Sequence, residues 1–113
     1  MPALVVRTKR AERDLAEIAV WTVERFGVDQ ARRYGAAIEA TLHGLRRAPD
    51  VLGARLRPEL GTDLWSVPVL AGRARSRHIV IFTWSASERP VRVLVLRILH
   101  ASMDFVRNLP PEA

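Results

Sequence analysis

Residues 77–99 read RHIVIFTWSASERPVRVLVLRIL, and this stretch decides the fold. It contains two runs, 77–84 and 91–99, that are rich in the β-branched and aromatic residues that favour strands. Both runs are apolar at successive positions over much of their length, which is typical of central strands covered on both faces. The residues between them, SASERP, are typical of a hairpin loop. The stretch therefore predicts the centre of an antiparallel sheet.

Two further strands are predicted upstream of this pair. One is residues 64–69, LWSVPV, in which Pro68 suits a sheet edge or a strand end because proline has no N–H to donate. The other is residues 3–7, ALVVR, a short β-branched run. Residues 49–62 contain two prolines and two glycines and predict a long connection within one domain. Residues 102–108 predict no more than one helical turn.

The first predicted helix spans residues 9–26. Its apolar stripe recurs every three or four residues, as one face of a helix requires. Thr8 is a suitable N-cap, and Gly27 suits the position after the helix C-terminus. The stripe consists of Ala11, Leu15, Ile18, Thr22 and Phe26.

The second predicted helix spans residues 30–47, with Asp29 as its N-cap and Pro49 closing it. The link between the helices is so short that they must fold back as an antiparallel hairpin. The order of elements predicts an α+β fold, in which an N-terminal strand, the hairpin and three antiparallel strands build one sheet with helices on one side. The second stripe consists of Ala31, Tyr34, Ile38, Leu42 and Leu45.

Composition predicts one globular domain over residues 1–113, a length that suits a single hydrophobic core. Hydrophobic residues make up 49% and charged residues 27%, far from a disordered composition. Cysteine is absent, which excludes disulfides and thiolate metal sites. Neither a signal-peptide apolar region nor an apolar run of about 18 residues is found, so we expect a soluble, cytoplasmic protein without membrane association.

The chain is strongly basic, with a formal net charge of +6, and every basic residue except Lys9 is arginine. Arginine offers a rigid donor fork for carboxylate and phosphate groups. A basic surface favours nucleic acid, the ribosome or an acidic protein as partner, and it is equally typical of simple solubility in an arginine-rich proteome. Aromatic and basic residues do not alternate, so we expect no direct sequence-specific binding to nucleic acid.

Metal and cofactor sites find little support in the sequence. The three histidines, His43, His78 and His100, are far apart, and none has a second ligand at metal-site spacing. A glycine-rich phosphate loop is missing as well. We therefore expect no metal and no cofactor.

Arg97 interrupts an otherwise apolar strand, and a buried arginine must be paired or functional. We expect a structural ion pair, with Asp104 or Glu59 as partner. Three tryptophans are expected to fill the core or an interface rather than to stack on bases: Trp21, Trp65 and Trp84.

Four segments, in this order along the chain, resemble motifs of the ParE/RelE toxin superfamily of type II toxin–antitoxin systems. The resemblance covers about residues 3–108 and is strongest for the ParE-like branch. It implies the ParE/RelE-like fold. The matching segments are AERDLAEI at 11–18 with FG at 26–27, then A and Y at 31 and 34 with L, L and P at 42, 45 and 49, then HIVIF at 78–82, and finally VLRILHASMD at 95–104.

RelE-type members of this superfamily are ribosome-dependent mRNA endonucleases, which need a base, an acid and cations at the scissile phosphate. Here Lys9 and Tyr34, the only lysine and tyrosine, do not occupy the family's catalytic positions. Ala101 also replaces an aromatic residue that often follows the histidine. A nuclease set could still be assembled from Glu59, Arg77, Arg97 and His100.

ParE-type members are implied to poison DNA gyrase by protein contact, without catalytic groups. The resemblance thus implies a growth-inhibiting, plasmid-stabilising gyrase inhibitor that a ParD-like antitoxin neutralises. The apolar faces of the hairpin and the sheet edge predict that the antitoxin covers them, and the net charge of +6 predicts that its covering segment is acidic. The alternatives are an mRNA endoribonuclease and a non-toxic antitoxin-binding module. The candidate target-binding residues are Arg73, Arg75, Arg77, His100, Met103, Asp104 and Arg107.

Four of these candidates, three arginines and His100, also have ordinary structural interpretations. The alternating arginines at 73, 75 and 77 are equally typical of a solvated basic hairpin loop. His100 at a strand end is more typical of a ring that bonds a backbone carbonyl than of a catalytic group.

Overall fold

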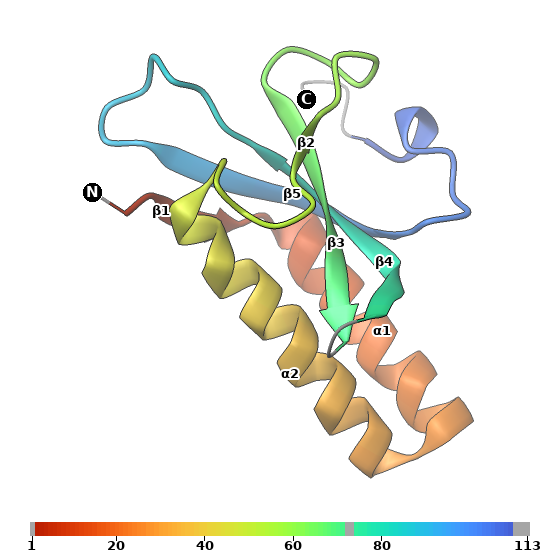
Figure 1. Cartoon of the computed structure of the whole chain (residues 1–113). Helices are drawn as coiled ribbons and strands as arrows, with labels where there is room; N and C mark the ends of the chain where they lie inside the picture. The colour runs from red at the N-terminus through yellow and green to blue at the C-terminus, as the bar shows by residue number, and fades with distance from the viewer. Residues whose placement is uncertain (1, 72–73, 110–113) are drawn as a thin grey trace.

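The computed structural model describes residues 2–71 and 74–109, which form one sheet with a helical hairpin packed against it (Figure 1). The strand order is β1-β5-β4-β3-β2. Strand β1 runs parallel to β5, and the other neighbours are antiparallel. The elements are β1 (Leu4–Arg7), α1 (Lys9–Phe26), α2 (Val28–Gly44), η1 (Leu45–Arg47), β2 (Arg55–Leu56), β3 (Leu64–Ala71), β4 (Ala74–Thr83), β5 (Arg92–His100) and η2 (Val106–Asn108).

The α+β class and the order of the main elements are confirmed, whereas the strand count differs by one. The additional strand, β2, lies within residues 49–62, which were expected to be a plain connection. It pairs only Arg55 with Ser66 and Leu56 with Trp65. A strand of two residues carries no alternation of side chains, so the sequence gives no sign of it.

Helix α1 has the predicted bounds, because Thr8 accepts a hydrogen bond from the Ala11 amide at 3.1 Å and so caps it. Helix α2 differs at both ends. It begins directly after Gly27, whose φ of 87° reverses the chain within one residue, so Asp29 lies in the first turn and does not cap. Its predicted last turn is the separate 3-10 helix η1.

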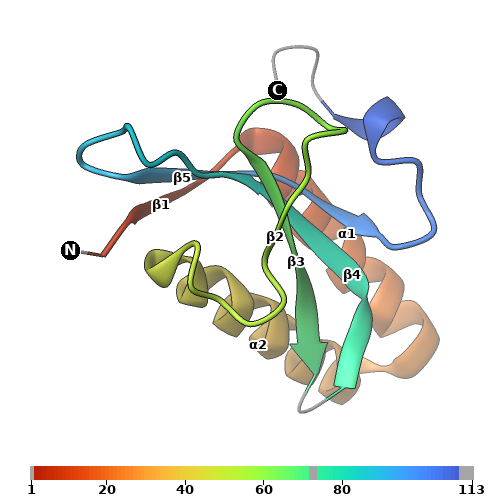
Figure 2. The ribbon, with the colours of Figure 1, turned by 45° about the horizontal axis from the view of Figure 1, so that its top comes forward.

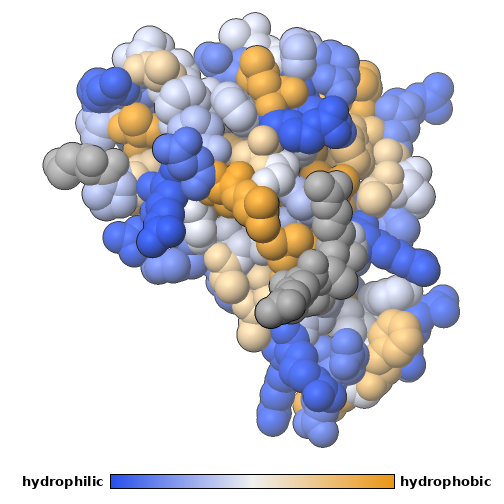
Figure 3. All heavy atoms as spheres, in the orientation of Figure 1, coloured by the Kyte–Doolittle hydropathy of each residue, from blue (hydrophilic) through white to orange (hydrophobic). Residues whose placement is uncertain are grey.

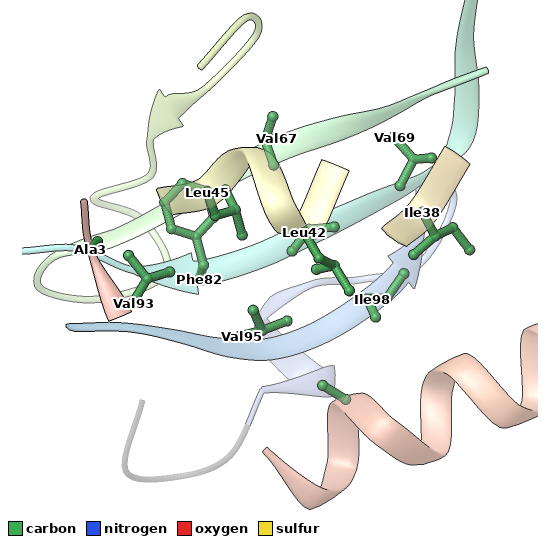
Figure 4. Packing of buried hydrophobic residues seen from close by; sticks show 12 residues of the cluster. Ala3, Ile38, Leu42, Leu45, Val67, Val69, Phe82, Val93, Val95 and Ile98 are labelled. Atoms are coloured by element: carbon green, nitrogen blue, oxygen red, sulfur yellow. The ribbon is translucent and has the colours of Figure 1, made fainter. Parts of the chain in front are cut away.

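The helices cover one face of the sheet, with α1 against β5 and α2 against β3. Figure 4 shows Ile38 and Leu42 of α2 and Leu45 of η1 beside strand residues such as Val67 and Phe82. The opposite face is covered by the connection before β3 and by the chain after β5, so the two central strands are buried on both faces. This second cluster contains Leu64, Ile81, Leu96 and Leu99, with Leu60, Phe105 and Leu109 packed against it.

Pro68 lies in β3 beyond the two residues that pair with β2, which is the edge position that proline requires. The register of β3 against β4 shifts between Pro68 and Leu70. Gly53 packs on Pro68 with a φ of 84°, and a Cβ at this position would lie 2.9 Å from the proline Cδ. The connection before β3 therefore lies directly against this edge residue.

The chain turns back after β5 toward η2, as Figure 2 shows. On the face seen in Figure 3, apolar side chains form a strip across the middle, bordered by hydrophilic residues. Among the described residues, no helix has the length and apolarity that a bilayer crossing would need.

Candidate functional site

The candidate site is built around Asp14 of α1 and Arg97 of β5, both buried. Arg97 donates to the Asp14 carboxylate through Nε at 2.8 Å and Nη2 at 3.0 Å, a two-pronged ion pair. Arg10 lies 3.6 Å from the same carboxylate and 3.9 Å from Glu17. Because both charges are paired and hydrogen-bonded, this buried pair fixes α1 against the sheet.

Asp14 also completes the edge of β5. Strand β1 pairs with β5 only as far as Val95, and beyond that point the backbone of β5 needs other partners. Thr8 donates to the Val95 carbonyl through its amide at 3.1 Å and its hydroxyl at 2.9 Å. The Ile98 amide then donates to Asp14 at 2.9 Å. The start of α1 therefore substitutes for a longer β1 strand.

Arg97 holds the C-terminal segment as well, because its Nη1 donates to the Asn108 carbonyl at 2.6 Å. Within that segment, Asp104 lies 3.5 Å from Arg107 and its carbonyl accepts from the Asn108 side chain at 2.7 Å. One guanidinium thus joins α1, β5 and the segment after β5.

Two histidines pack edge to face next to this ion pair. His78 of β4 and His100 of β5 are paired across the strands, and their ring centroids are 5.6 Å apart at an interplanar angle of 86°. Tyr34 of α2 bonds His78 Nδ1 through its hydroxyl at 2.5 Å and donates to Ser76 at 2.9 Å. The fold therefore gathers a phenol and two imidazoles from three elements that are distant in sequence.

His100 is held by Ser102, two residues further along the chain. Its Nδ1 lies 2.7 Å from the Ser102 hydroxyl and 3.2 Å from the Ser102 amide. Both contacts use the same ring nitrogen, so the orientation of the imidazole is fixed on that side. The His100 ring therefore bonds Ser102 and not the backbone carbonyl that its position at a strand end would suggest.

The imidazoles line two adjoining cavities of about 490 Å³ and 350 Å³. The larger lies between α1 and the segment after β5, and the smaller reaches Tyr34 and the end of the helical hairpin. Both are open to solvent. The residues that they share are Trp21, His78 and His100.

The electrostatics of this site favour neutral side chains. Burial lowers the pKa of His78, and the neighbouring His100 lowers it further, while Asp14 acts in the opposite direction. Burial also raises the pKa of Tyr34, which keeps its phenol protonated. The site thus offers a neutral imidazole and a phenol at neutral pH, groups that can exchange protons or hold a polar ligand.

A comparison with known protein families identifies the family of this chain. A family model described as "ParE toxin of type II toxin-antitoxin system, parDE" matches residues 5–105. The chain belongs to the ParE toxin family. A comparison with curated proteins gives no significant match.

Solved structures of toxin–antitoxin systems share the fold. The chromosomal ParDE TA system from P. aeruginosa matches with a TM-score of 0.60 at 17% identity, over 87% of this chain and 95% of that chain. The toxin–antitoxin complex RelBE2 from Mycobacterium tuberculosis matches with a TM-score of 0.58 at 24% identity, over 88% and 99%. At these identities the likeness concerns the fold alone.

In this ParE-family chain, the predicted target-binding residues fall into separate groups. Arg77 is exposed on β4 and lines the smaller cavity, and Met103 is 46% exposed at the larger one. Asp104 and Arg107 pair with each other on the C-terminal segment. Arg75 belongs to β4 rather than to a loop, and Arg73 lies outside the described residues.

The predicted nuclease set is only partly brought together. Arg77, Arg97 and His100 surround the two cavities, but Glu59 lies 3.6 Å from Arg57 and lines neither of them. The expected partners of Arg97, Asp104 and Glu59, are also wrong, because Asp14 takes that place. The prediction that Arg97 forms a buried ion pair is itself confirmed.

Three residues of the site in this ParE-family chain were not chosen from the sequence: Asp14, Tyr34 and His78. Each stands in a segment that carries the family resemblance, which was the available signal. Tyr34 was not expected at a catalytic position, yet it contacts His78, which packs on His100.

An apolar surface adjoins the smaller cavity at the end of the helical hairpin. Trp21 and Phe26 pack edge to face with centroids 5.8 Å apart, and the Arg25 guanidinium lies 5.1 Å from the Trp21 ring centroid. Five apolar side chains near this end of the hairpin are exposed: Val20, Trp21, Val23, Phe26 and Val28. We call these five residues the hairpin-end surface.

Proposed function

We propose that this ParE-family chain inhibits DNA gyrase by binding it and that a ParD-like antitoxin neutralises the chain. The observation that carries the proposal is the match to the ParE toxin family. It extends over residues 5–105 and so includes Asp14 and Arg97, around which the candidate site is built. Inhibition by binding requires a complementary surface and no complete catalytic set.

The exposed part of the site supports a binding role. Arg77 and Met103 are exposed at the rims of the two cavities, and Arg107 is 86% exposed on the C-terminal segment. Arginine and methionine are among the residues enriched in protein interfaces. We infer that these side chains contact the target, while Asp14 and Arg97 hold the surface in place.

The hairpin-end surface supports the antitoxin part of the proposal. Five exposed apolar residues on adjacent helix ends are suited to an amphipathic partner segment. The net charge of +6 favours an acidic one. The similar structure from P. aeruginosa is named as a ParDE system, which agrees with a ParD-like partner for this chain.

A growth assay tests the toxin and antitoxin together. Induction of this chain in bacteria is expected to stop growth, and co-expression of the product of the adjacent gene is expected to restore it. Replacement by serine of the exposed Val20 and Val28, which line neither cavity, should weaken rescue while leaving growth arrest in place. Unimpaired growth on induction, with folded protein accumulating, would favour a non-toxic binding module.

A ribosome-dependent endoribonuclease is the second candidate, favoured by the contact of Tyr34 with His78 and of His78 with His100. In this chemistry one imidazole removes the proton of a ribose 2′-OH, whose oxygen attacks the phosphorus. The other imidazole, protonated, gives its proton to the departing 5′-oxygen as the P–O5′ bond breaks. Arg77 is the exposed cation near enough to face the phosphate charge.

The two functions are separated by two assays on one preparation. The gyrase proposal predicts inhibited supercoiling or trapped cleaved DNA, with ribosome-bound mRNA left intact. Codon-specific mRNA cleavage that disappears in His100→Ala and slows in Tyr34→Phe would establish the nuclease instead.

A further inference from the structure

The two imidazoles share a feature that neither proposed function requires. In each ring Nδ1 is the nitrogen bonded to a neighbour, by Tyr34 in His78 and by Ser102 in His100. No hydrogen bond to either Nε2 atom is found among the side chains that the structure describes, which do not include those of residues 71–75. A histidine that binds a metal ion typically donates the N–H of one ring nitrogen to a neighbouring group and binds the ion through the other nitrogen. His78 can do so through Tyr34, whereas Nδ1 of His100 accepts from the Ser102 amide, so His100 must change its tautomer to bind an ion.

The separation of the rings also suits a single ion. Imidazole nitrogens bind zinc at about 2.0–2.1 Å, which places the ring centroids of two ligands on one ion roughly 5–6 Å apart. The centroids of His78 and His100 are 5.6 Å apart. Their cross-strand pairing comes from the backbone register and needs no metal to form.

We propose that His78 and His100 together bind one divalent transition-metal ion, Zn²⁺ or Ni²⁺, through their Nε2 atoms. Water completes the coordination, because the ion would lie at the junction of the two open cavities. In the metal-binding form His100 carries its proton on Nδ1 and donates to the Ser102 hydroxyl, giving up the longer contact with the amide.

The positive charges around His78 and His100 are paired or exposed to solvent, so they permit a cation to bind there. Arg97 is fully engaged by Asp14 and the Asn108 carbonyl, and Arg10 lies beside Asp14 and Glu17. Arg77 is exposed to solvent, which screens it.

Calorimetric titration of the untagged full chain with ZnCl₂ and with NiCl₂ tests the proposal. One equivalent should bind, and His78→Ala and His100→Ala should each weaken binding by at least about tenfold. His43→Ala is the matched control, because His43 is exposed on α2, away from both cavities, and its removal should change nothing. Binding that persists in both site variants, or is lost in His43→Ala, would overturn the proposal.

Nuclear magnetic resonance of the wild-type chain gives a second readout that does not depend on variants folding. Zn²⁺ should shift the ring Hε1 signals of His78 and His100 together at one equivalent and leave those of His43 in place. Shifts confined to His43, or no saturable shift at all, would contradict the site. Neither measurement involves gyrase, ribosomes or an antitoxin, so its outcome is independent of the proposed function.

Discussion

Asp14 and Arg97 lie 83 residues apart in sequence and form a two-pronged buried ion pair that joins the first helix to the last strand. Asp14 accepts a third hydrogen bond from the Ile98 amide, and Arg97 donates a further one to the Asn108 carbonyl. Removing either side chain would leave a buried charge and buried backbone groups without partners.

We therefore predict that Arg97→Ala lowers the free energy of unfolding by at least about 2 kcal/mol. Urea denaturation followed by circular dichroism measures this change. Arg107→Ala is the control, since its ion pair with Asp104 is solvent-exposed and should contribute little. An unchanged stability in Arg97→Ala, with toxicity lost, would make Arg97 a functional residue instead.

The N-cap of α1 gives a second stability prediction. The Thr8 hydroxyl accepts from the Ala11 amide and donates to the Val95 carbonyl, so Thr8→Ala should cost about 1–2 kcal/mol of unfolding free energy. Thr41→Ala removes a mid-helix hydroxyl that donates to the Ala37 carbonyl, and it should be close to neutral. Equal effects of the two substitutions in thermal denaturation would contradict this role for Thr8.

The lowered pKa of His78 predicts a pH dependence of stability. Below the ordinary histidine pKa of about 6.5, the unfolded chain binds a proton that the folded chain resists, so stability should fall as the pH drops through this range and then level off. His78→Gln should flatten the profile between pH 7.5 and 5.5. His43→Gln, at an exposed site, should leave the profile unchanged. Identical slopes in wild type and His78→Gln would refute the assignment.

Association with the antitoxin should depend on salt, because the chain carries a net charge of +6 and an acidic partner segment is expected. Stopped-flow mixing with the product of the adjacent gene should show an association rate that falls as ionic strength rises, with a smaller effect on dissociation. An association rate that does not respond to ionic strength would contradict the prediction that opposite charges draw the chain and the antitoxin together.

Most of the fold could be predicted from periodicity. Helix α1 was predicted correctly from the apolar stripe from Ala11 to Phe26. Strands β4 and β5 were predicted from the two apolar runs on either side of the loop at residues 85–90. Long segments with a regular pattern allow few other structures. The two-residue strand β2 and the 3-10 end of the second helix could not be found, since neither has a period of its own.

The candidate site could be predicted less well from the sequence, because its residues are brought together by the register between β4 and β5. A hairpin closed at Trp84 and Val91 would place His78 opposite Arg97. The observed pairing is displaced by three residues, partly at the irregularity where Ile81 and Phe82 face Arg97 and Val95, so His78 lies opposite His100. Bulges of this kind follow from packing and have no simple sequence signal.

The partners of Arg97 illustrate the same limit. Its position in an apolar strand predicted a buried ion pair, but several carboxylates along the chain could have supplied it. Asp14 was expected on a helix face, and only the way in which α1 continues the edge of β5 brings it to Arg97. Charge and burial thus predicted the kind of interaction, and tertiary packing decided the partner.

Inhibition of gyrase is the central claim, and supercoiling of relaxed plasmid by purified gyrase, measured against increasing amounts of this chain, tests it most directly. We expect inhibition by the wild-type chain, and inhibition weakened by about tenfold in Arg77→Glu, which reverses an exposed charge at the site. Arg92→Glu, at the opposite end of β5 from His100, should inhibit like wild type. Undiminished supercoiling in a large molar excess of folded wild-type chain would contradict the account.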